Sequence, residues 1–303
     1  MEEFDVIIIG AGAAGISAAF WCNELGLKTV VLEESDSVGG QLNYVYNPIE
    51  NHLGANFKSG KDFILGIKSQ IEARKPDLRF NSKVTELDFS SRTVVSNSQR
   101  LSYEFLIIAT GIRRRTLGLQ GELEFAGAGI IESGAASAYR FDGKRVVIVG
   151  GGDAAFENAL IFSEHAQSIF IINRTENFRA RAEFQKLVKN EPKINVLANS
   201  VVREIYGGSN VNAVLIEDVS NGKLRKIETD GVLVRIGAVP NSELFLPSIA
   251  ADETAYILTD KYFRTNEDRV FAIGDVSNPN APTIATAEGS AAIAAKQIRV
   301  IYR

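Results

Sequence analysis

The sequence is poor in the residues that carry thiol and metal chemistry. Its 303 residues include one cysteine, Cys22, and two histidines, His52 and His165. A single cysteine excludes an internal disulfide, a dithiol redox centre and a cysteine-held iron–sulfur cluster within this chain. Two histidines leave little material for a zinc site, so no metal site is predicted. Any redox chemistry must therefore depend on bound organic cofactors.

Long apolar runs and a strong excess of one charge are also missing. No apolar stretch reaches the roughly 18 residues that span a bilayer. The first predicted strand starts almost at once, which leaves no room for a signal peptide. The 33 basic and 37 acidic residues give a net charge of −4, which favours neither nucleic acid nor an anionic membrane as a partner. We therefore expect a cytoplasmic protein with no membrane span.

Chain length points to more than one domain. With 45% hydrophobic residues in 303, the chain exceeds the size at which single hydrophobic cores usually split. No tandem repeat or low-complexity tract is present, but two similar glycine-rich turns indicate two related halves. Two domains are expected.

The first of these turns follows the apolar run at 4–9 and has the sequence GAGAAG at 10–15. A helical pattern follows over 16–25, and a second strand at 29–32 ends in Glu33. In a strand–turn–helix unit of this type, the glycines permit a tight turn, close approach of a pyrophosphate and close helix packing. The acid about 20 residues further on accepts hydrogen bonds from a ribose. A dinucleotide site is predicted here.

The second turn, GGGDAA at 150–155, lies between the strand at 145–149 and a helical segment. Its partner strand at 168–172 is followed by Asn173-Arg174 instead of an acid. A carboxylate at this position would repel a 2′-phosphate. An arginine can instead pair with that phosphate, so the second site favours NADP(H). A solvated loop arginine is the alternative for Arg174.

The remaining pattern predicts further α/β elements. Helices are expected at 61–74 and 283–298, and a glycine-rich loop at 38–42. Short strands are expected at 78–80, 84–89 and 93–95, with the last two antiparallel. Buried strands are expected at 105–109 and from residue 270.

Several motifs in order along the chain resemble the low-molecular-weight thioredoxin reductases, a family of FAD- and NAD(P)-dependent pyridine nucleotide–disulphide oxidoreductases. The matching segments are GAGAAG with Glu33, GGQL at 39–42, IENHLG at 49–54, ATG at 109–111, GGGDAA, FRA at 178–180, IGAVPN at 236–241 and FAIGD at 271–275. The resemblance covers nearly the whole chain.

This resemblance implies an α/β fold with two Rossmann-like three-layer domains. Residues 1–112 and 238–303 would form an FAD-binding domain, and residues 113–237 an inserted NAD(P)H-binding domain. The two connections, near 111–116 and 236–241, would act as hinges. A homodimer is also implied.

By position in the family pattern, cofactor-binding residues can be assigned to each domain. For FAD they are Gly10, Gly12, Ala13, Ala14, Gly15, Glu33, Gly40, Gln41, Leu42, Asn51, Val84, Ala109, Thr110, Gly111, Gly274, Asp275, Ala281, Pro282 and Thr283. For NADPH they are Gly150, Gly152, Asp153, Ala154, Ala155, Arg174 and Arg179. No side chain is assigned as catalytic. His52, beside flavin-side Asn51, is either a proton donor or a packing residue.

Two departures from the family pattern limit the resemblance. Thioredoxin reductases carry Cys-x-x-Cys before the second turn, where this chain has Ser133-Gly134-Ala135-Ala136. Reduction of thioredoxin by a dithiol relay is therefore excluded, and Cys22, on the first helix, is interpreted as a core thiol. NADPH-selective members also have His-Arg-Arg where this chain has Asn173-Arg174-Thr175, which weakens the preference for NADPH.

The sequence thus predicts an oxidoreductase that passes electrons from NAD(P)H through FAD to an external acceptor such as ferredoxin, flavodoxin, a quinone or oxygen. Family members without the cysteines include ferredoxin/flavodoxin–NADP reductases, which carry a C-terminal extension over the flavin. This chain stops at Arg303, so a more open flavin is expected. A ferredoxin-fed flavoprotein with a vestigial nicotinamide site and a non-catalytic flavin-binding module stay open as alternatives.

Arginines 113–115 offer a basic landing site for an acidic electron carrier. The alternative interpretation is a solvated hinge in which these arginines pair with Glu122 or Glu124.

Overall fold

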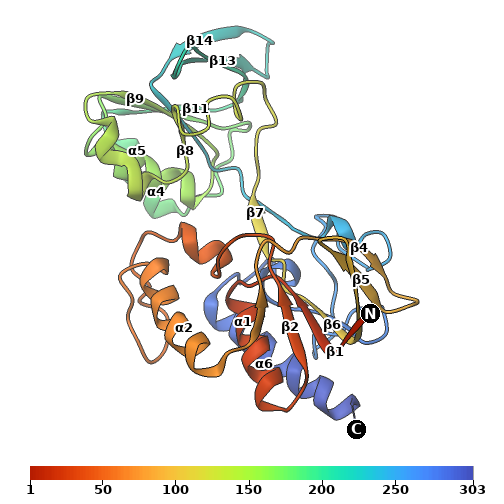
Figure 1. Cartoon of the computed structure of the whole chain (residues 1–303). Helices are drawn as coiled ribbons and strands as arrows, with labels where there is room; N and C mark the ends of the chain where they lie inside the picture. Colours follow the sequence, from red (N-terminus) through yellow and green to blue (C-terminus); the bar gives the residue numbers. More distant parts are fainter. Residues whose placement is uncertain (303) are drawn as a thin grey trace. The chain divides into compact units, whose positions relative to one another are not determined.

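The structure, a computed structural model, describes residues 1–302 and divides into two compact units (Figure 1). Unit 1 comprises Met1–Arg113 and the chain from Val239 onward, and unit 2 comprises Arg114–Ala238. The chain crosses between the units in two short strands, β7 (Ile112–Arg114) and β16 (Ala238–Pro240), which pair with each other.

Unit 1 is built on a seven-stranded sheet in the order β3-β2-β1-β6-β5-β4, with β17 also paired to β6. β1 is parallel to β2 and β6, and β17 is parallel to β6. β4 and β5 form the antiparallel pair expected from the sequence. The strands are β1 (Glu2–Ile9), β2 (Thr29–Leu32), β3 (Asp77–Arg79), β4 (Val84–Asp88), β5 (Thr93–Ser96), β6 (Gln99–Ile108) and β17 (Val270–Ala272).

Two helices of unit 1 begin at side-chain caps. The Ser59 hydroxyl accepts a hydrogen bond from the Asp62 N–H at 3.3 Å, and Thr283 and Thr286 cap each other reciprocally. The expected loop at 38–42 is instead largely a turn of 3₁₀ helix. The helical segments are α1 (Ala13–Glu24), η1 (Gly40–Tyr44), α2 (Gly60–Arg74), η3 (Glu243–Phe245), η4 (Gly274–Ser277) and α6 (Ile284–Ile301).

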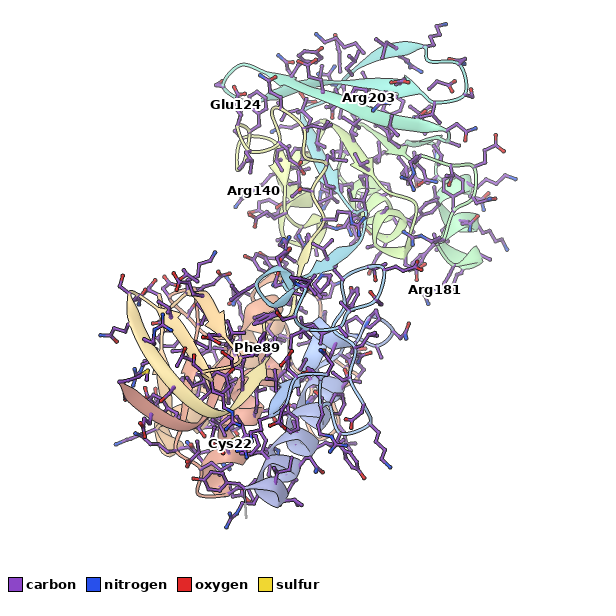
Figure 2. All side chains as sticks on the ribbon, turned by 90° about the vertical axis from the view of Figure 1, so that its right-hand side faces the viewer. Cys22, Phe89, Glu124, Arg140, Arg181 and Arg203 are labelled. Carbon is purple, nitrogen blue, oxygen red and sulfur yellow. The ribbon has the colours of Figure 1, made fainter. Side chains whose placement is uncertain are left out.

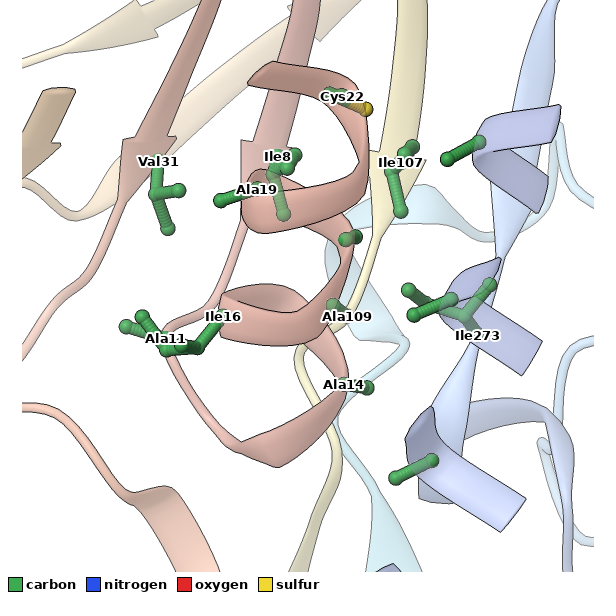
Figure 3. Packing of buried hydrophobic residues seen from close by; sticks show 14 of the residues in the cluster. Ile8, Ala11, Ala14, Ile16, Ala19, Cys22, Val31, Ile107, Ala109 and Ile273 are labelled. Carbon is green, nitrogen blue, oxygen red and sulfur yellow. The ribbon is translucent and has the colours of Figure 1, made fainter. Parts of the chain in front are cut away.

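The main core of unit 1 lies between its sheet and the helices α1 and α6. Ile8 and Ile107 project from the sheet toward small residues of α1, among them Ala19 (Figure 3). Alanines on α1 and α6 bring the two helices close together. A second core fills the opposite face of the sheet. Because both faces are covered, the parallel strands read as continuous apolar runs.

Unit 2 contains a parallel sheet in the order β11-β10-β9-β15-β8 and a separate antiparallel sheet, β12-β13-β14. The parallel strands are β8 (Ile130–Ile131), β9 (Arg145–Val149), β10 (Ser168–Ile172), β11 (Ile194–Leu197) and β15 (Gly231–Val234). The others are β12 (Ser200–Gly207), β13 (Val211–Asp218) and β14 (Leu224–Glu228), and the helical segments are α3 (Gly134–Ser137), η2 (Ala138–Phe141), α4 (Asp153–Ser163) and α5 (Ala182–Asn190).

The predicted α/β class with two Rossmann-like sheets is confirmed. Each unit has a buried core on both faces of its parallel sheet. Within residues 1–302, no helix combines the length and apolarity needed to cross a membrane.

The thiol of Cys22 generates a first prediction. Its side chain is fully buried on the sheet-facing side of α1 (Figures 2 and 3), and burial raises the pKa of the thiol to about 12. Because only the thiolate reacts, we expect the native protein to resist thiol labelling at pH 8, with one thiol labelled after unfolding in guanidinium. Cys22→Ala provides the zero-label control. Rapid labelling of one thiol in the native protein would contradict the buried position.

Candidate cofactor-binding sites

The first glycine-rich turn brings α1 against the end of β1. Gly10 has a φ of +105°, and its N–H donates to the Leu32 carbonyl at 2.8 Å. A Cβ on Gly15 would lie 1.9 Å from the Gly10 carbonyl oxygen, so only glycine allows this packing. A Cβ on Gly12 would meet no atom within 4 Å. Gly10 and Gly15 therefore build the turn, and Gly12 leaves it open.

A cavity of about 560 Å³ in unit 1 adjoins this turn, at the carboxyl ends of β1, β2 and β6. This is the edge at which open α/β sheets bind ligands, and the volume lies within the roughly 300–1,000 Å³ usual for ligand pockets. The sequence-predicted FAD residues that line the cavity are Gly10, Gly12, Ala13, Ala14, Glu33, Gly40, Gln41, Leu42, Ala109, Thr110, Gly111, Asp275, Pro282 and Thr283.

The other predicted FAD residues do not line this cavity. Gly15 lies beneath the turn, and Val84 is buried in the core on the opposite face of the sheet. Gly274 donates its N–H to the Ser290 hydroxyl at 3.1 Å. The Ala281 carbonyl accepts hydrogen bonds from Asn278 and Thr286, and Asn51 is exposed in the loop 50–56.

His52, in the same loop, occupies a packing position. Its ring lies edge-on to Phe57 and Phe63, with centroid separations of 5.8 and 5.2 Å. Its Nε2 atom lies 3.3 Å from a carboxylate oxygen of Glu288 on α6. The side chain therefore joins the loop to α6, which favours the packing interpretation.

Glu33 already has hydrogen-bond donors from the backbone. One carboxylate oxygen accepts from the Ala11 N–H at 2.6 Å, and the other accepts from the N–H and the hydroxyl of Ser35. The acid thus fixes the glycine-rich turn to the loop after β2. Because each carboxylate oxygen has two acceptor positions, capacity for a ribose remains.

Asp275 differs from Glu33 because its carboxylate has no such support. It lies half-buried at the cavity, and within residues 1–302 no donor forms a hydrogen bond with its side chain. Burial raises the pKa of this carboxyl group above its ordinary value. An unsupported carboxylate facing a cavity fits a ligand that brings hydroxyl donors, such as the ribityl chain of a flavin.

The structure adds Asn241 and Arg113 to the residues that line the cavity. The Thr110 hydroxyl donates to the Asn241 carbonyl at 2.6 Å, and the Asn241 amide donates back to the Thr110 carbonyl at 2.8 Å. Arg113 donates to the Asn241 side chain and pairs with Glu243. The alternative interpretation pairs this arginine with Glu122 or Glu124; its partner in unit 1 is Glu243 instead, and Glu122 accepts from the backbone N–H groups of residues 117 and 118.

The glycine-rich turn of unit 2, at 150–155, has the same form as that of unit 1 but packs against a different backbone carbonyl, that of Arg235. Gly150 has a φ of +142°. A Cβ added to it would lie 2.0 Å from the carbonyl oxygen of Arg235, the residue after β15. A Cβ on Gly152 would meet nothing within 4 Å. The N–H groups of Arg179 and Ala180 both donate to the Gly151 carbonyl. The FRA segment is thus bound directly to the turn.

The predicted cofactor ligand Asp153 is held by a protein partner. Its carboxylate accepts from the Arg181 N–H at 2.7 Å and from the Arg181 Nε at 2.9 Å. Arg181, labelled in Figure 2, therefore pairs with the acid and offsets its charge. Ala154 and Ala155 form the first turn of α4, and the side chains of Arg174 and Arg179 are exposed.

Each of these two turns lies between a parallel strand and a helix. The chain that contains them matches known proteins along nearly its whole length. A family model for pyridine nucleotide-disulphide oxidoreductase matches residues 4–292. A thioredoxin reductase of Treponema pallidum (strain Nichols) is 33% identical over 296 residues, which cover 97% of this chain and 95% of that protein. The chain belongs to the pyridine nucleotide-disulphide oxidoreductase family.

Solved structures agree with this membership. The crystal structure of Lactococcus lactis thioredoxin reductase in the FR conformation is similar with a TM-score of 0.84 and 30% identity, covering 99% of this chain and 100% of that one. T. acidophilum thioredoxin reductase gives 0.81 and 30%, covering 100% of this chain and 99% of that one. The family binds FAD and NAD(P)H.

The segment Ser133–Ala136, where the sequence resemblance places the cysteine pair of thioredoxin reductases, contains no thiol. Ser133 is the N-cap of the short helix α3, and its hydroxyl accepts from the Ala136 N–H at 3.4 Å. The Gly134 N–H donates to the Asn158 side chain of α4 at 3.0 Å. The segment is thus held by hydrogen bonds, and the only cysteine is the buried Cys22.

Substituting Gly12 and substituting Gly15 should have different effects, one on flavin binding and the other on stability. Gly12→Ala places its Cβ in open space, so we expect a change in unfolding free energy below about 1 kcal/mol but strongly reduced flavin binding. Gly15→Ala forces α1 away from the turn and should lower the free energy of unfolding by about 1–3 kcal/mol. Chemical unfolding and flavin titration measure both effects. Undiminished flavin binding by Gly12→Ala would contradict a phosphate at this position.

Asp275→Asn should make the flavin-free protein more stable and weaken its binding of flavin. Because burial raises the pKa of Asp275, the folded flavin-free protein binds this proton more tightly than the unfolded chain and loses stability as the pH rises through the ordinary Asp range of about 3.9 to the raised value. The variant lacks this loss, so its flavin-free form should be more stable than the wild type at neutral pH.

The stability difference should disappear at a pH below the ordinary Asp range. Flavin affinity should fall roughly ten- to hundred-fold, as expected for a lost charge-assisted hydrogen bond. Unfolding at two pH values and flavin titration provide the test. Equal stability at neutral pH together with unchanged affinity would contradict the assignment.

Proposed function

We propose that this chain is an FAD-dependent NAD(P)H oxidoreductase that delivers electrons to an external acceptor without a dithiol of its own. The observation that carries the proposal is the combination of two open glycine-rich turns with Ser133–Ala136 in place of a redox cysteine pair. Ferredoxin, flavodoxin, a quinone and oxygen are the proposed acceptor classes, and a homodimer remains the proposed assembly.

FAD is proposed for unit 1. Gly12 would leave space for its pyrophosphate at the start of α1, and Glu33 would face its ribose. The Asp275 carboxylate would accept hydrogen bonds from its ribityl hydroxyl groups. Gln41 donates to the Ile112 carbonyl at 2.9 Å, and so anchors η1 to the rim of the cavity. When bound, the flavin supplies the redox chemistry by accepting a hydride equivalent and passing electrons on.

NADPH is proposed for unit 2. Gly152 leaves the turn at the start of α4 open to a pyrophosphate, and the helix N-terminus favours an anion there. Arg174 and Arg179 are exposed and available for a 2′-phosphate, while Thr175 occupies a position that is arginine in NADPH-selective members. The preference for NADPH over NADH is therefore proposed to be moderate.

The electron capacity of the purified protein distinguishes this function from that of a dithiol enzyme. In an anaerobic dithionite titration we expect one two-electron equivalent per flavin, because no cysteine pair can take up a second. NADPH should bleach the visible flavin absorbance rapidly in stopped flow. Gly152→Ala should lose reduction by NADPH but keep its flavin.

Gly208→Ala is the matched control, because its Cβ would also lie in open space within unit 2 but away from the turn. If reduced ferredoxin bleaches the flavin and neither nucleotide does, the nicotinamide half of the proposal is wrong. A protein that binds no flavin, or takes up two equivalents per flavin, overturns the proposal as a whole.

A further inference from the structure

The parallel sheet of unit 2 arranges its strand ends in a fixed spatial order. Its strands run β11-β10-β9-β15-β8 from one side to the other, all are parallel, and the last four flank the turn. At their carboxyl ends lie, in that order, Asn173-Arg174, the turn from Gly150, Arg235 and Glu132. Neighbouring strands are about 4.8 Å apart, so Arg235 lies one strand beyond the turn, on the side opposite Arg174.

Arg235 is in direct backbone contact with the turn. Its N–H donates to the Val149 carbonyl at 2.7 Å, and its own carbonyl occupies the space where a Cβ of Gly150 would lie. Its position is therefore fixed by the same packing that shapes the turn.

The guanidinium group of Arg235 is held by carbonyl oxygens. It donates to the Val234 carbonyl at 2.8 Å and to the Glu132 carbonyl at 2.7 Å, and within residues 1–302 no carboxylate lies within 4.0 Å of it. Arg114 donates to the same Glu132 carbonyl. Burial, with a smaller contribution from the charge of Arg114, lowers the pKa of Arg235 to about 10. An anion bound beside these two guanidinium groups would be attracted by both.

We propose that Arg235 and Arg114 form an oxyanion site that receives the nicotinamide-side phosphate of the dinucleotide bound at the Gly150–Gly152 turn. This inference rests on the proposed function. A dinucleotide with its adenosine 2′-phosphate at Arg174 crosses β9 with its pyrophosphate and reaches β15 with its nicotinamide half. The phosphate nearer the nicotinamide then lies on the side of Arg235.

The turn itself supplies a reason for this additional positive charge. Asp153 begins α4 and places a carboxylate beside the helix N-terminus, where it reduces the attraction for a phosphate. Arg181 offsets that carboxylate on one side. Arg235 and Arg114 then contribute the second positive group, at the phosphate that lies farther from Arg181.

Fragment binding tests the proposal by calorimetric titration of the intact flavin-loaded protein. NADP⁺ contains the nicotinamide-side phosphate, whereas 2′,5′-ADP contains only adenosine-side phosphates. Arg235→Gln should weaken NADP⁺ binding roughly ten- to hundred-fold, as for the loss of a charge-assisted hydrogen bond, and leave 2′,5′-ADP binding within about two-fold. Arg235→Lys, which keeps the charge, should weaken NADP⁺ less than Arg235→Gln.

Arg140→Gln is the matched control, because Arg140 is an exposed arginine of the same unit that contacts Tyr139 (Figure 2). It should change neither affinity. Thermal unfolding of each variant checks that the unit remains folded. Equal weakening of both ligands by Arg235→Gln, or no weakening of either, overturns the inference. A loss restricted to binding of a polyglutamate peptide also overturns it, because the site would then serve an acidic protein.

Failure of the proposed function gives a different result. Wild-type protein that binds neither NADP⁺ nor 2′,5′-ADP refutes the nicotinamide site itself, and this inference with it. Wild-type protein that binds both ligands, with an Arg235→Gln variant that behaves like wild type, refutes only the role of Arg235.

Discussion

Both units depend on the close contact between a helix N-terminus and the end of a parallel strand. In unit 1 this contact joins Gly15 to the Gly10 carbonyl, and a single Cβ would bring atoms to 1.9 Å. The contact fixes where the free N–H groups of α1 point and keeps the space beside Gly12 open. The cavity and the direction of the helix dipole follow from it. Most of the candidate FAD site is therefore a property of the backbone.

The same constraint yields two chemically different sites because the neighbouring groups differ. After β2 comes Glu33, whose carboxylate is fixed by the Ala11 N–H, so unit 1 presents an acid at its cavity. After β10 come Asn173 and Arg174, and Arg235 directly follows β15, the strand beside the turn. Unit 2 therefore presents cations on both sides of its turn. A free ribose diol suits the first arrangement, and a dinucleotide with an additional phosphate suits the second.

The sequence predicted the features that depend on short segments. The turns, their flanking strands and helices, and the buried Cys22 follow from local pattern, because each involves residues close together in the chain. The contacts of Asn241 with Thr110 and of Arg181 with Asp153 join residues 131 and 28 positions apart. Such pairings depend on how loops meet in three dimensions, which periodicity does not encode. The Arg181 partner of Asp153 is for this reason not predictable from the local sequence.

The segment Ser133–Ala136 is held in place without thiols. Ser133 caps α3, and Asn158 of α4 binds the Gly134 N–H while its amide donates to the Ala154 carbonyl. These hydrogen bonds hold the segment against the helix of the second turn without any covalent link. The framework around the second turn is therefore held together without a disulfide. The one cysteine of the chain, Cys22, is buried in the core of unit 1, so under the proposed function electrons pass from the flavin to an acceptor outside this chain.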